Sequence, residues 1–279
     1  MSVDTDIRAV ADHLTGVTKL GVAYSGGVDS ATLLAIAVDA LGPDRVLALL
    51  AVSASLASRE REIAHRVAAD LGVQVIELAT DELANPDYAK NDVDRCFFCK
   101  DELFTTIDDQ IVAGHALDAV AYGENADDAL RPDRPGSRAA TNHRVLRPLA
   151  AAGLTKARVR EIARHYGLAV ADKPASPCLS SRIPHGQPVT AEKLRQIDAG
   201  EAVLHEAGFS DVRLRHHGDL ARIEVPRDEV SRFADDELRA SIEKQLKDLG
   251  FRHVTVDLGG LASGAFTLQI LNSRGLTHA

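Results

Sequence analysis

Residues 25–30 read Ser-Gly-Gly-Val-Asp-Ser, directly after the apolar residues 20–24 and directly before a helical run. A glycine pair between a strand and a helix lets the backbone approach an anion without obstruction by Cβ atoms. The exposed N–H groups and the dipole of the first helical turn then favour phosphate. The stretch lacks the lysine of the Walker A pattern. Residues 25–30 therefore predict an α/β fold with a phosphate-binding loop that is not of the Walker A type.

The side chains of this stretch suit a nucleotide that carries a metal ion. Ser25 and Ser30 add hydroxyl donors for phosphate oxygens, and Asp29 offers a carboxylate to the Mg²⁺ that accompanies ATP. The alternative is a glycine-rich turn between a strand and a helix without a ligand. The predicted ATP- and phosphate-binding residues are Ser25, Gly26, Gly27, Val28, Asp29, Ser30, Ser53 and Lys156.

The first part of the chain alternates strand-like and helix-like segments. The strand candidates are near-continuous apolar runs, which are typical of parallel strands covered on both faces. We therefore expect a doubly wound, mainly parallel sheet in a first domain over residues 1–184. Ligands bind at the carboxyl ends of such strands, where residues 25–30, Ser53 and residues 123–128 would lie. The strand candidates are residues 19–24, 45–52, 73–78 and 119–122.

The sequence pattern changes after Pro174. Residues 174–190 contain four prolines and cannot form one regular element. The pattern that follows predicts a smaller α+β domain over residues 185–279, for substrate binding or oligomerisation. The elements expected in it are a helix over 191–207, a hairpin around Gly218, a helix over 228–249 and a strand over 253–256.

The composition limits the classes of partner. The chain has 32 Lys and Arg against 41 Asp and Glu, and its net charge of −9 argues against a broad nucleic-acid surface. No apolar run approaches the roughly 20 residues of a membrane span, and the N-terminus lacks the basic and apolar segments of a signal peptide. We therefore expect a cytoplasmic protein that binds neither nucleic acid nor membrane.

The chain has three cysteines, Cys96, Cys99 and Cys178. In a reducing compartment, metal binding or catalysis is expected of them rather than a disulfide. The Cys-x-x-Cys spacing lets Cys96 and Cys99 share one metal ion or cluster. Three thiolates fall short of the four that close a structural zinc site or an ordinary Fe–S cluster. A [4Fe–4S] cluster on three cysteines keeps one iron open for an external ligand such as hydrosulfide. A working sulfur on Cys178 alone, a zinc half-site, a redox pair and inert thiols are alternatives.

The ordered set of motifs resembles one known family. Residues 25–30 are similar to the pyrophosphate loop of the PP-loop ATP pyrophosphatases, which have an adenine nucleotide alpha hydrolase-like fold, and the other motifs resemble the LarE-type sulfur transferases. The resemblance spans nearly the whole chain. The other motifs are residues 95–100 (RCFFCK), 123–128 (GENADD), 133–136 (DRPG), 147–149 (RPL), 154–156 (LTK) and 172–184 (DKPASPCLSSRIP).

The resemblance implies an ATP-dependent step in the synthesis of the nickel-pincer nucleotide cofactor of lactate racemase. In this step, carboxylates of a pyridinium mononucleotide are adenylylated and converted to thiocarboxylates. One branch of the family takes the sulfur from a single cysteine at the position of Cys178. Another branch holds a [4Fe–4S] cluster on cysteines at the positions of Cys96, Cys99 and Cys178, and this chain is similar to that branch. The family also implies a homo-oligomer, such as a hexamer.

The resemblance and the motif positions complete the predicted site. Asp29 and Cys178 are the expected catalytic residues, and Asp29 and Asp128 are the expected Mg²⁺ ligands. Arg213 and Arg215 alternate along a strand, which places them on one face; a plain polar strand face is the alternative. The predicted substrate-binding residues are Ser180, Arg182, Glu201, Arg213 and Arg215.

Three other functions are alternatives to sulfur transfer to a nucleotide. A cluster-dependent tRNA thiolase shares the loop and the cysteine layout, but it requires a basic surface for tRNA. An amidating enzyme of the NAD- or GMP-synthase type uses the same loop with ammonia, and it leaves the three cysteines unexplained. A nucleotide-binding regulatory module without catalysis would have no need of Asp29 beside the glycine pair.

Overall fold

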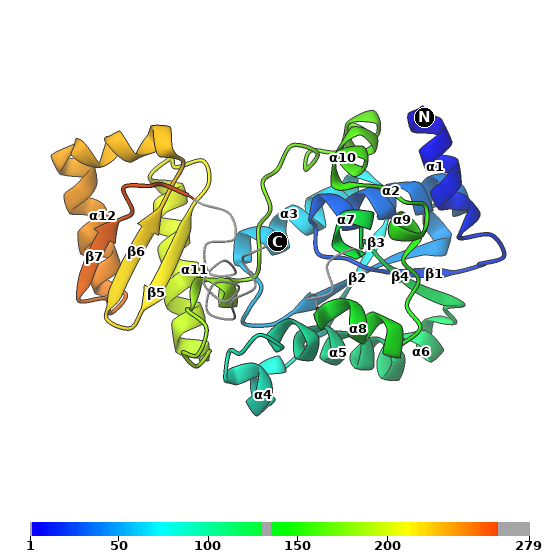
Figure 1. Cartoon of the computed structure of the whole chain (residues 1–279), viewed down its shortest axis with the longest axis horizontal. Helices are drawn as coiled ribbons and strands as arrows, with labels where there is room; N and C mark the ends of the chain where they lie inside the picture. The colour runs from blue at the N-terminus through cyan, green and yellow to red at the C-terminus, as the bar shows by residue number, and fades with distance from the viewer. Residues whose placement is uncertain (1, 130–134, 262–279) are drawn as a thin grey trace, which may run out of the picture. The chain divides into compact units, whose positions relative to one another are not determined.

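The structure, a computed structural model, describes residues 2–129 and 135–261, so positions 133–134 of the DRPG motif lie outside the described residues. It comprises two compact units (Figure 1). The first contains Met1–Glu82 and Asp94–Ser176, and the second contains Leu83–Val93 and Pro177–Ala279. The segment Leu83–Val93 thus leaves the first unit and returns to it. Whether residues 1–184 and 185–279 fold as separate domains stays a prediction.

The first unit is built on a four-stranded parallel sheet with the order β3-β2-β1-β4. The α/β fold predicted from the sequence is therefore confirmed. The order reverses at β1: the chain moves outward from β1 to β2 and β3 and then crosses to β4 on the other side. Ligands of such sheets bind at the switch point, here the carboxyl ends of β1 and β4. The strands are β1 (Leu20–Ala23), β2 (Val46–Val52), β3 (Gln74–Ala79) and β4 (Ala119–Tyr122).

Helices cover both faces of this sheet (Figure 1). In β2, Val46, Ala48 and Leu50 belong to the apolar cluster with α1, α2, α3 and α10, whereas Leu47 and Leu49 belong to the cluster with α5 and α8. This alternation explains why β2 is apolar at every position. The helices are α1 (Val3–Asp12), α2 (Val28–Leu41), α3 (Ser58–Asp70), α5 (Arg95–Ile107), α6 (Ala113–His115), α7 (Ala126–Ala129), α8 (Pro135–Asn142), α9 (Pro148–Ala151) and α10 (Lys156–His165).

The second unit packs two helices on a small mixed sheet of order β5-β6-β7. The predicted hairpin around Gly218 is confirmed, because β5 and β6 pair antiparallel on either side of it. The predicted helix over residues 228–249 is wrong in its first part: a 3₁₀ helix, Arg227–Ala234, precedes α12, and the Asp235 side chain caps α12. The elements are α4 (Pro86–Ala89), α11 (Ala191–Glu206), β5 (Arg213–His217), β6 (Leu220–Glu224), α12 (Asp236–Asp248) and β7 (His253–Val256).

Candidate active site

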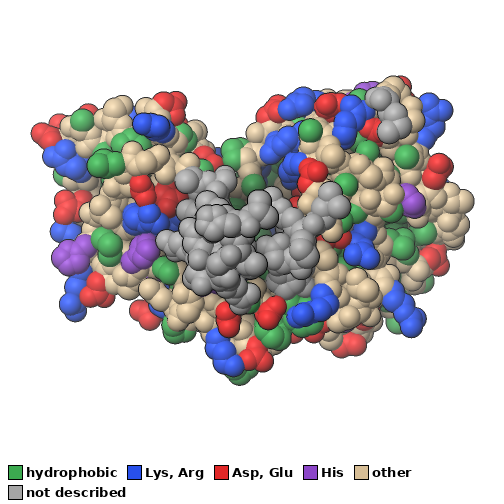
Figure 2. Space-filling view, viewed as in Figure 1, with side chains coloured by type: hydrophobic (Ala, Val, Ile, Leu, Met, Phe, Trp, Pro, Cys, Tyr) green, Lys and Arg blue, Asp and Glu red, His purple; other side chains and the backbone are tan. Residues whose placement is uncertain are grey.

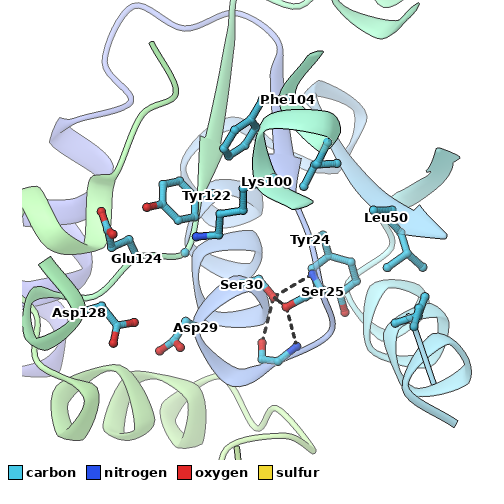
Figure 3. A pocket seen from close by; sticks show the side chains of 16 residues that line it. Tyr24, Ser25, Asp29, Ser30, Leu50, Lys100, Phe104, Tyr122, Glu124 and Asp128 are labelled. Atoms are coloured by element: carbon cyan, nitrogen blue, oxygen red, sulfur yellow. Dashed lines mark hydrogen bonds between the residues drawn. The ribbon is translucent and has the colours of Figure 1, made fainter. Parts of the chain in front are cut away.

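A cavity of about 300 Å³ lies in the first unit at the carboxyl ends of β1 and β4 (Figure 3). Its volume is at the lower end of the range for small-molecule sites. The residues around it are apolar on the side of Leu50 and Phe104 and acidic on the side of Asp29 and Asp128. Its lining comprises Ala23, Tyr24, Ser25, Gly27, Asp29, Ser30, Leu50, Ala51, Leu56, Lys100, Leu103, Phe104, Tyr122, Gly123, Glu124 and Asp128.

The loop between β1 and α2 has the form expected of a phosphate-binding loop. Gly26 has a φ of +70°, and a Cβ atom there would lie 2.8 Å from the Cβ of Ala64 in α3, so only glycine fits. Gly27 is the N-cap of α2 and offers no side chain to the first helical N–H groups. Ser25 and Ser30 approach each other, with 3.2 Å between their Oγ atoms. The first turn of α2 therefore presents N–H groups and hydroxyls to an anion.

Asp29 lies in this first turn and contacts two distant parts of the chain. Its Oδ2 accepts a hydrogen bond of 2.5 Å from Nζ of Lys156, at the start of α10. Its Oδ1 accepts a longer bond of 3.4 Å from Nδ2 of Asn125. The same Nδ2 donates to Oδ2 of Asp128 at 3.0 Å, and Figure 3 shows the carboxylates of Asp29 and Asp128 side by side. The structure thus brings together three of the predicted ATP and metal residues.

Gly123, at the end of β4, fixes the distance between this strand and α2. A Cβ atom on Gly123 would lie 2.7 Å from the backbone carbon of Asp29 and from the nitrogen of Ser30. Backbone cannot move aside as a flexible side chain does. The close contact therefore holds the phosphate-binding turn against the end of β4, directly before the segment that contains Glu124 and Asp128.

We expect Gly123→Ala to destabilise the first unit by about 1–3 kcal/mol, because it overpacks this contact, and to weaken ATP binding. Urea unfolding and calorimetric titration with ATP measure the two effects. Gly114→Ala is the matched control, because a Cβ atom at Gly114 has nothing within 4 Å among the described residues. Equal stability and equal ATP affinity for Gly123→Ala and the parent protein would contradict the role given to this contact.

Lys100 brings a cationic group to the lining of the cavity, to which Lys156 does not belong. The Nζ atom of Lys100 lies 4.3 Å from the centre of the Tyr122 ring, in a cation–π contact. Burial raises the pKa of Tyr122, and the nearby Glu124 carboxylate raises it further, so that the ring keeps an uncharged hydroxyl. Glu124 itself is buried and accepts hydrogen bonds from Ser137 and, at 3.5 Å, from Arg147. This network joins the acidic side of the cavity to α8.

Ser53 does not belong to the cavity lining, although it follows β2 at the same edge of the sheet. Its hydroxyl donates a 2.6 Å hydrogen bond to the buried carboxylate of Glu82. Its role in ATP binding stays a prediction. Tyr122, Glu124, Asn125 and Lys100 were not among the predicted site residues, although residues 123–128 were expected at this edge of the sheet. The motifs GENADD and RCFFCK contained all of these except Tyr122, and only the folded chain shows what they contact.

The cysteines are divided between the two units. Cys96 and Cys99 lie three residues apart in α5, and residues at this spacing share one face of a helix. Cys178 is exposed and caps the 3₁₀ helix Leu179–Arg182 of the second unit. Within residues 2–129 and 135–261, no three His, Cys, Asp or Glu side chains form a group that could hold a metal ion. Metal binding by these cysteines stays a prediction.

The predicted substrate-binding residues of the second unit form buried polar contacts around the Cys178 segment. Arg182 donates to both carboxylate oxygens of Glu201, at 2.8 and 3.1 Å, and to the carbonyl oxygen of Cys178, at 3.3 Å. Arg215 donates to the carbonyl oxygen of Ser181 and to Glu224, at 3.0 and 2.8 Å.

The two other members of this predicted set are also held by intramolecular bonds. The hydroxyls of Ser180 and Tyr88 lie 2.7 Å apart, and Arg213 pairs with Asp211 at 2.5 Å. Both bonds lie within the second unit. In this structure Arg182 and Arg215 therefore hold the backbone around Cys178, and Glu201 holds Arg182. Contact of the five residues with a substrate stays a prediction.

Arg182→Leu should destabilise the second unit by about 3–5 kcal/mol, because it leaves the Glu201 carboxylate buried without its partner. The Arg182 and Glu201 side chains are only 2% and 9% exposed. Arg164→Leu removes a comparable pair with Asp172 whose side chains are 51% and 74% exposed, and we expect a change below about 1 kcal/mol there. Urea unfolding of both variants measures the difference, and similar losses would show that burial does not decide the effect.

Every helix in the described part of the chain is too short or too polar to cross a membrane.

Comparisons with known proteins agree with this geometry. A family model described as asparagine synthase matches residues 7–178. The pyridinium-3,5-bisthiocarboxylic acid mononucleotide synthase of Lactiplantibacillus plantarum is 36% identical, over 95% of each chain. An uncharacterized protein of a Synechocystis species is 41% identical, over 87% of this chain and 90% of its own. A glutamine-dependent NAD(+) synthetase of Xylella fastidiosa matches only 26% of this chain. The chain therefore belongs to the PP-loop family that the asparagine synthase model describes and, within it, to the LarE family.

Proposed function

We propose that this protein is an ATP-dependent sulfur transferase that converts carboxylates of a pyridinium mononucleotide to thiocarboxylates, as a step in making a nickel-pincer nucleotide. The name of the Lactiplantibacillus plantarum relative, a pyridinium-3,5-bisthiocarboxylic acid mononucleotide synthase, supports the substrate class. The observation that carries the ATP-dependent step is the glycine loop at the switch point of the sheet, with Asp29 beside Asp128. We include in the proposal a cytoplasmic location and a homo-oligomer such as a hexamer.

The first chemical step is the activation of an unreactive acid. A carboxylate oxygen of the substrate attacks the α-phosphorus of ATP, and the bond from this phosphorus to the pyrophosphate oxygen breaks. The backbone N–H groups at the start of α2 and the hydroxyls of Ser25 and Ser30 would bind the departing pyrophosphate. Lys156, which pairs with Asp29, would add positive charge there. The product is an acyl adenylate with AMP as its leaving group.

The acidic side chains fit a magnesium ion. Mg²⁺ commonly takes one or two protein carboxylates and completes its octahedron with phosphate oxygens and water. Asp29 and Asp128 supply two carboxylates, and an ammonium group already lies 2.5 Å from Asp29, which shows that this position accommodates positive charge. When bound, Mg²⁺ would neutralise charge on the departing pyrophosphate.

The second step adds sulfur. A sulfur nucleophile attacks the acyl carbon of the adenylate, and the carbon–oxygen bond to AMP breaks with its electron pair leaving on AMP. We propose that Cys96, Cys99 and Cys178 hold a [4Fe–4S] cluster that would supply hydrosulfide. Three thiolates of this kind suit a cluster that keeps one iron open. The other source of sulfur is Cys178 itself, whose exposed side chain is accessible to reagents.

The charge distribution disfavours the tRNA thiolase. On the face drawn in Figure 2, the described Lys and Arg side chains are interspersed with Asp and Glu. The net charge of −9 also opposes binding to a polyanion. An amidating enzyme of the NAD-synthase type is disfavoured, because the NAD(+) synthetase of Xylella fastidiosa matches only 26% of this chain.

The proposal is tested by incubating the anaerobically purified protein with ATP, Mg²⁺ and pyridinium-3,5-biscarboxylic acid mononucleotide. We expect pyrophosphate, AMP and a product in which sulfur replaces a carboxylate oxygen, all detected by mass spectrometry. Formation of ADP in place of AMP would overturn the proposed activation step. Pyrophosphate release that requires ammonia and yields an amide would establish the amidating function instead.

A further inference from the structure

Asn125 occupies a buried position behind the acidic side of the cavity. It lies between β4 and α7, and only 2% of its surface is exposed. Its Nδ2 donates to Asp128 at 3.0 Å and, more weakly, to Asp29 at 3.4 Å. Its Oδ1 accepts the backbone N–H of Asp128 at 3.0 Å. One amide group therefore links the phosphate-binding turn to the loop after β4, across 96 residues of sequence.

This arrangement addresses an electrostatic difficulty. Two carboxylates that face each other repel, and without a donor or cation between them they would turn apart. The Asn125 amide supplies two N–H donors without adding charge. Lys156 meanwhile supplies a cation to the other oxygen of Asp29. One oxygen of each carboxylate thus has a donor from Asn125, and Oδ2 of Asp29 faces a positive charge.

We propose that Asn125 is a positioning residue of the magnesium site: it holds Asp29 and Asp128 side by side so that both bind the ion that enters with ATP. This inference rests on the proposed function and extends it to a residue that touches neither nucleotide nor metal. Groups that orient metal ligands in this way typically contribute about 10- to 100-fold to metal affinity.

The measurement is Mn²⁺ binding, followed by electron paramagnetic resonance, with a non-hydrolysable ATP analogue present. We expect Asn125→Ser to weaken Mn²⁺ binding at least about tenfold. Serine still offers an oxygen to cap the Asp128 N–H, but it cannot donate to two carboxylates. Asn125→Ala removes the cap as well, and its loss of Mn²⁺ affinity should be at least as large as that of Asn125→Ser. With ATP in place of the analogue, the rate of pyrophosphate release at saturating Mn²⁺ should fall much less in these variants than their affinity for Mn²⁺.

Asn85→Ala is the matched control, since Asn85 also caps a helix, through the backbone N–H of Asp87, but belongs to the other unit. It should bind Mn²⁺ as the parent protein does. Parent-like Mn²⁺ affinity in Asn125→Ser would overturn the inference. If Asn125→Ala lost Mn²⁺ affinity while Asn125→Ser kept that of the parent, the cap on the Asp128 N–H alone would explain the effect of Asn125. If the parent protein itself bound no Mn²⁺ with the analogue, the proposed function would fail rather than the role of Asn125.

Discussion

Asp29→Ala should reduce ATP-dependent pyrophosphate release at least about 100-fold, the loss expected when one preorganised group that stabilises developing charge is removed. Asp29 stands in the first turn of α2, lines the cavity and pairs with Lys156 at 2.5 Å. Alanine removes one of the two carboxylates that we assign to Mg²⁺, and its methyl group cannot bind the ion. The measurement is the initial rate of pyrophosphate formation at saturating ATP and substrate.

The fold should survive this change. The Asp29 and Lys156 side chains are 21% and 35% exposed, so water can solvate the released ammonium group. Asp39→Ala is the matched control, because Asp39 lies on the same helix and, within the described residues, accepts a side-chain bond only from Tyr166 at the surface. Its pyrophosphate release should equal that of the parent protein. Thiolated product that accumulates at the parent rate in Asp29→Ala would falsify the proposed activation step.

Cys178→Ser should abolish formation of the thiocarboxylate while pyrophosphate and AMP are still produced. Serine preserves the size of the exposed side chain but supplies neither a sulfur atom nor a thiolate ligand. In the described part of the chain, the hydrogen bonds of residue 178 are accepted by its carbonyl oxygen, from Arg182 and from the backbone of Ser181, and not made by its side chain. The two chemical steps should therefore separate in this variant, and mass spectrometry of product and nucleotide measures both.

The source of sulfur follows from a comparison with Cys96→Ser and Cys99→Ser. If the three cysteines hold a cluster, all three variants should lose bound iron and thiolated product together. If Cys178 is sacrificed, the Cys96 and Cys99 variants should complete one turnover, and Cys178 should then show the mass loss of H₂S. Full thiolation by Cys178→Ser would exclude both routes and favour an external sulfur donor.

Local sequence patterns predicted the first unit well. The run from residue 20 to residue 41 specifies a strand, a glycine turn and a helix through short-range sterics and hydrogen bonding alone. Parallel strands need crossover connections of a dozen or more residues, so alternating patterns imply a sheet with its loops at one edge. The start of α10 depends on the same short-range bonding, since the hydroxyl of Thr155 accepts the N–H of Arg158.

Contacts between distant segments could not be predicted in this way. The bond from Asn125 to Asp29 and the bond from Lys156 to Asp29 join residues 96 and 127 positions apart. The segment Leu83–Val93 belongs to the second unit, where Tyr88 approaches Ser180. No periodicity in the sequence encodes which of many polar residues will meet across such separations.

The glycine turn after a buried strand and the three cysteines of a LarE-type chain could be predicted from the residues alone, because these features depend on residue type and short spacing. The amide that holds two carboxylates together and the pairing of Arg182 with Glu201 could be recognised only in the folded chain. Such pairings exist only once the topology has brought remote segments together and burial has made an unpaired charge costly.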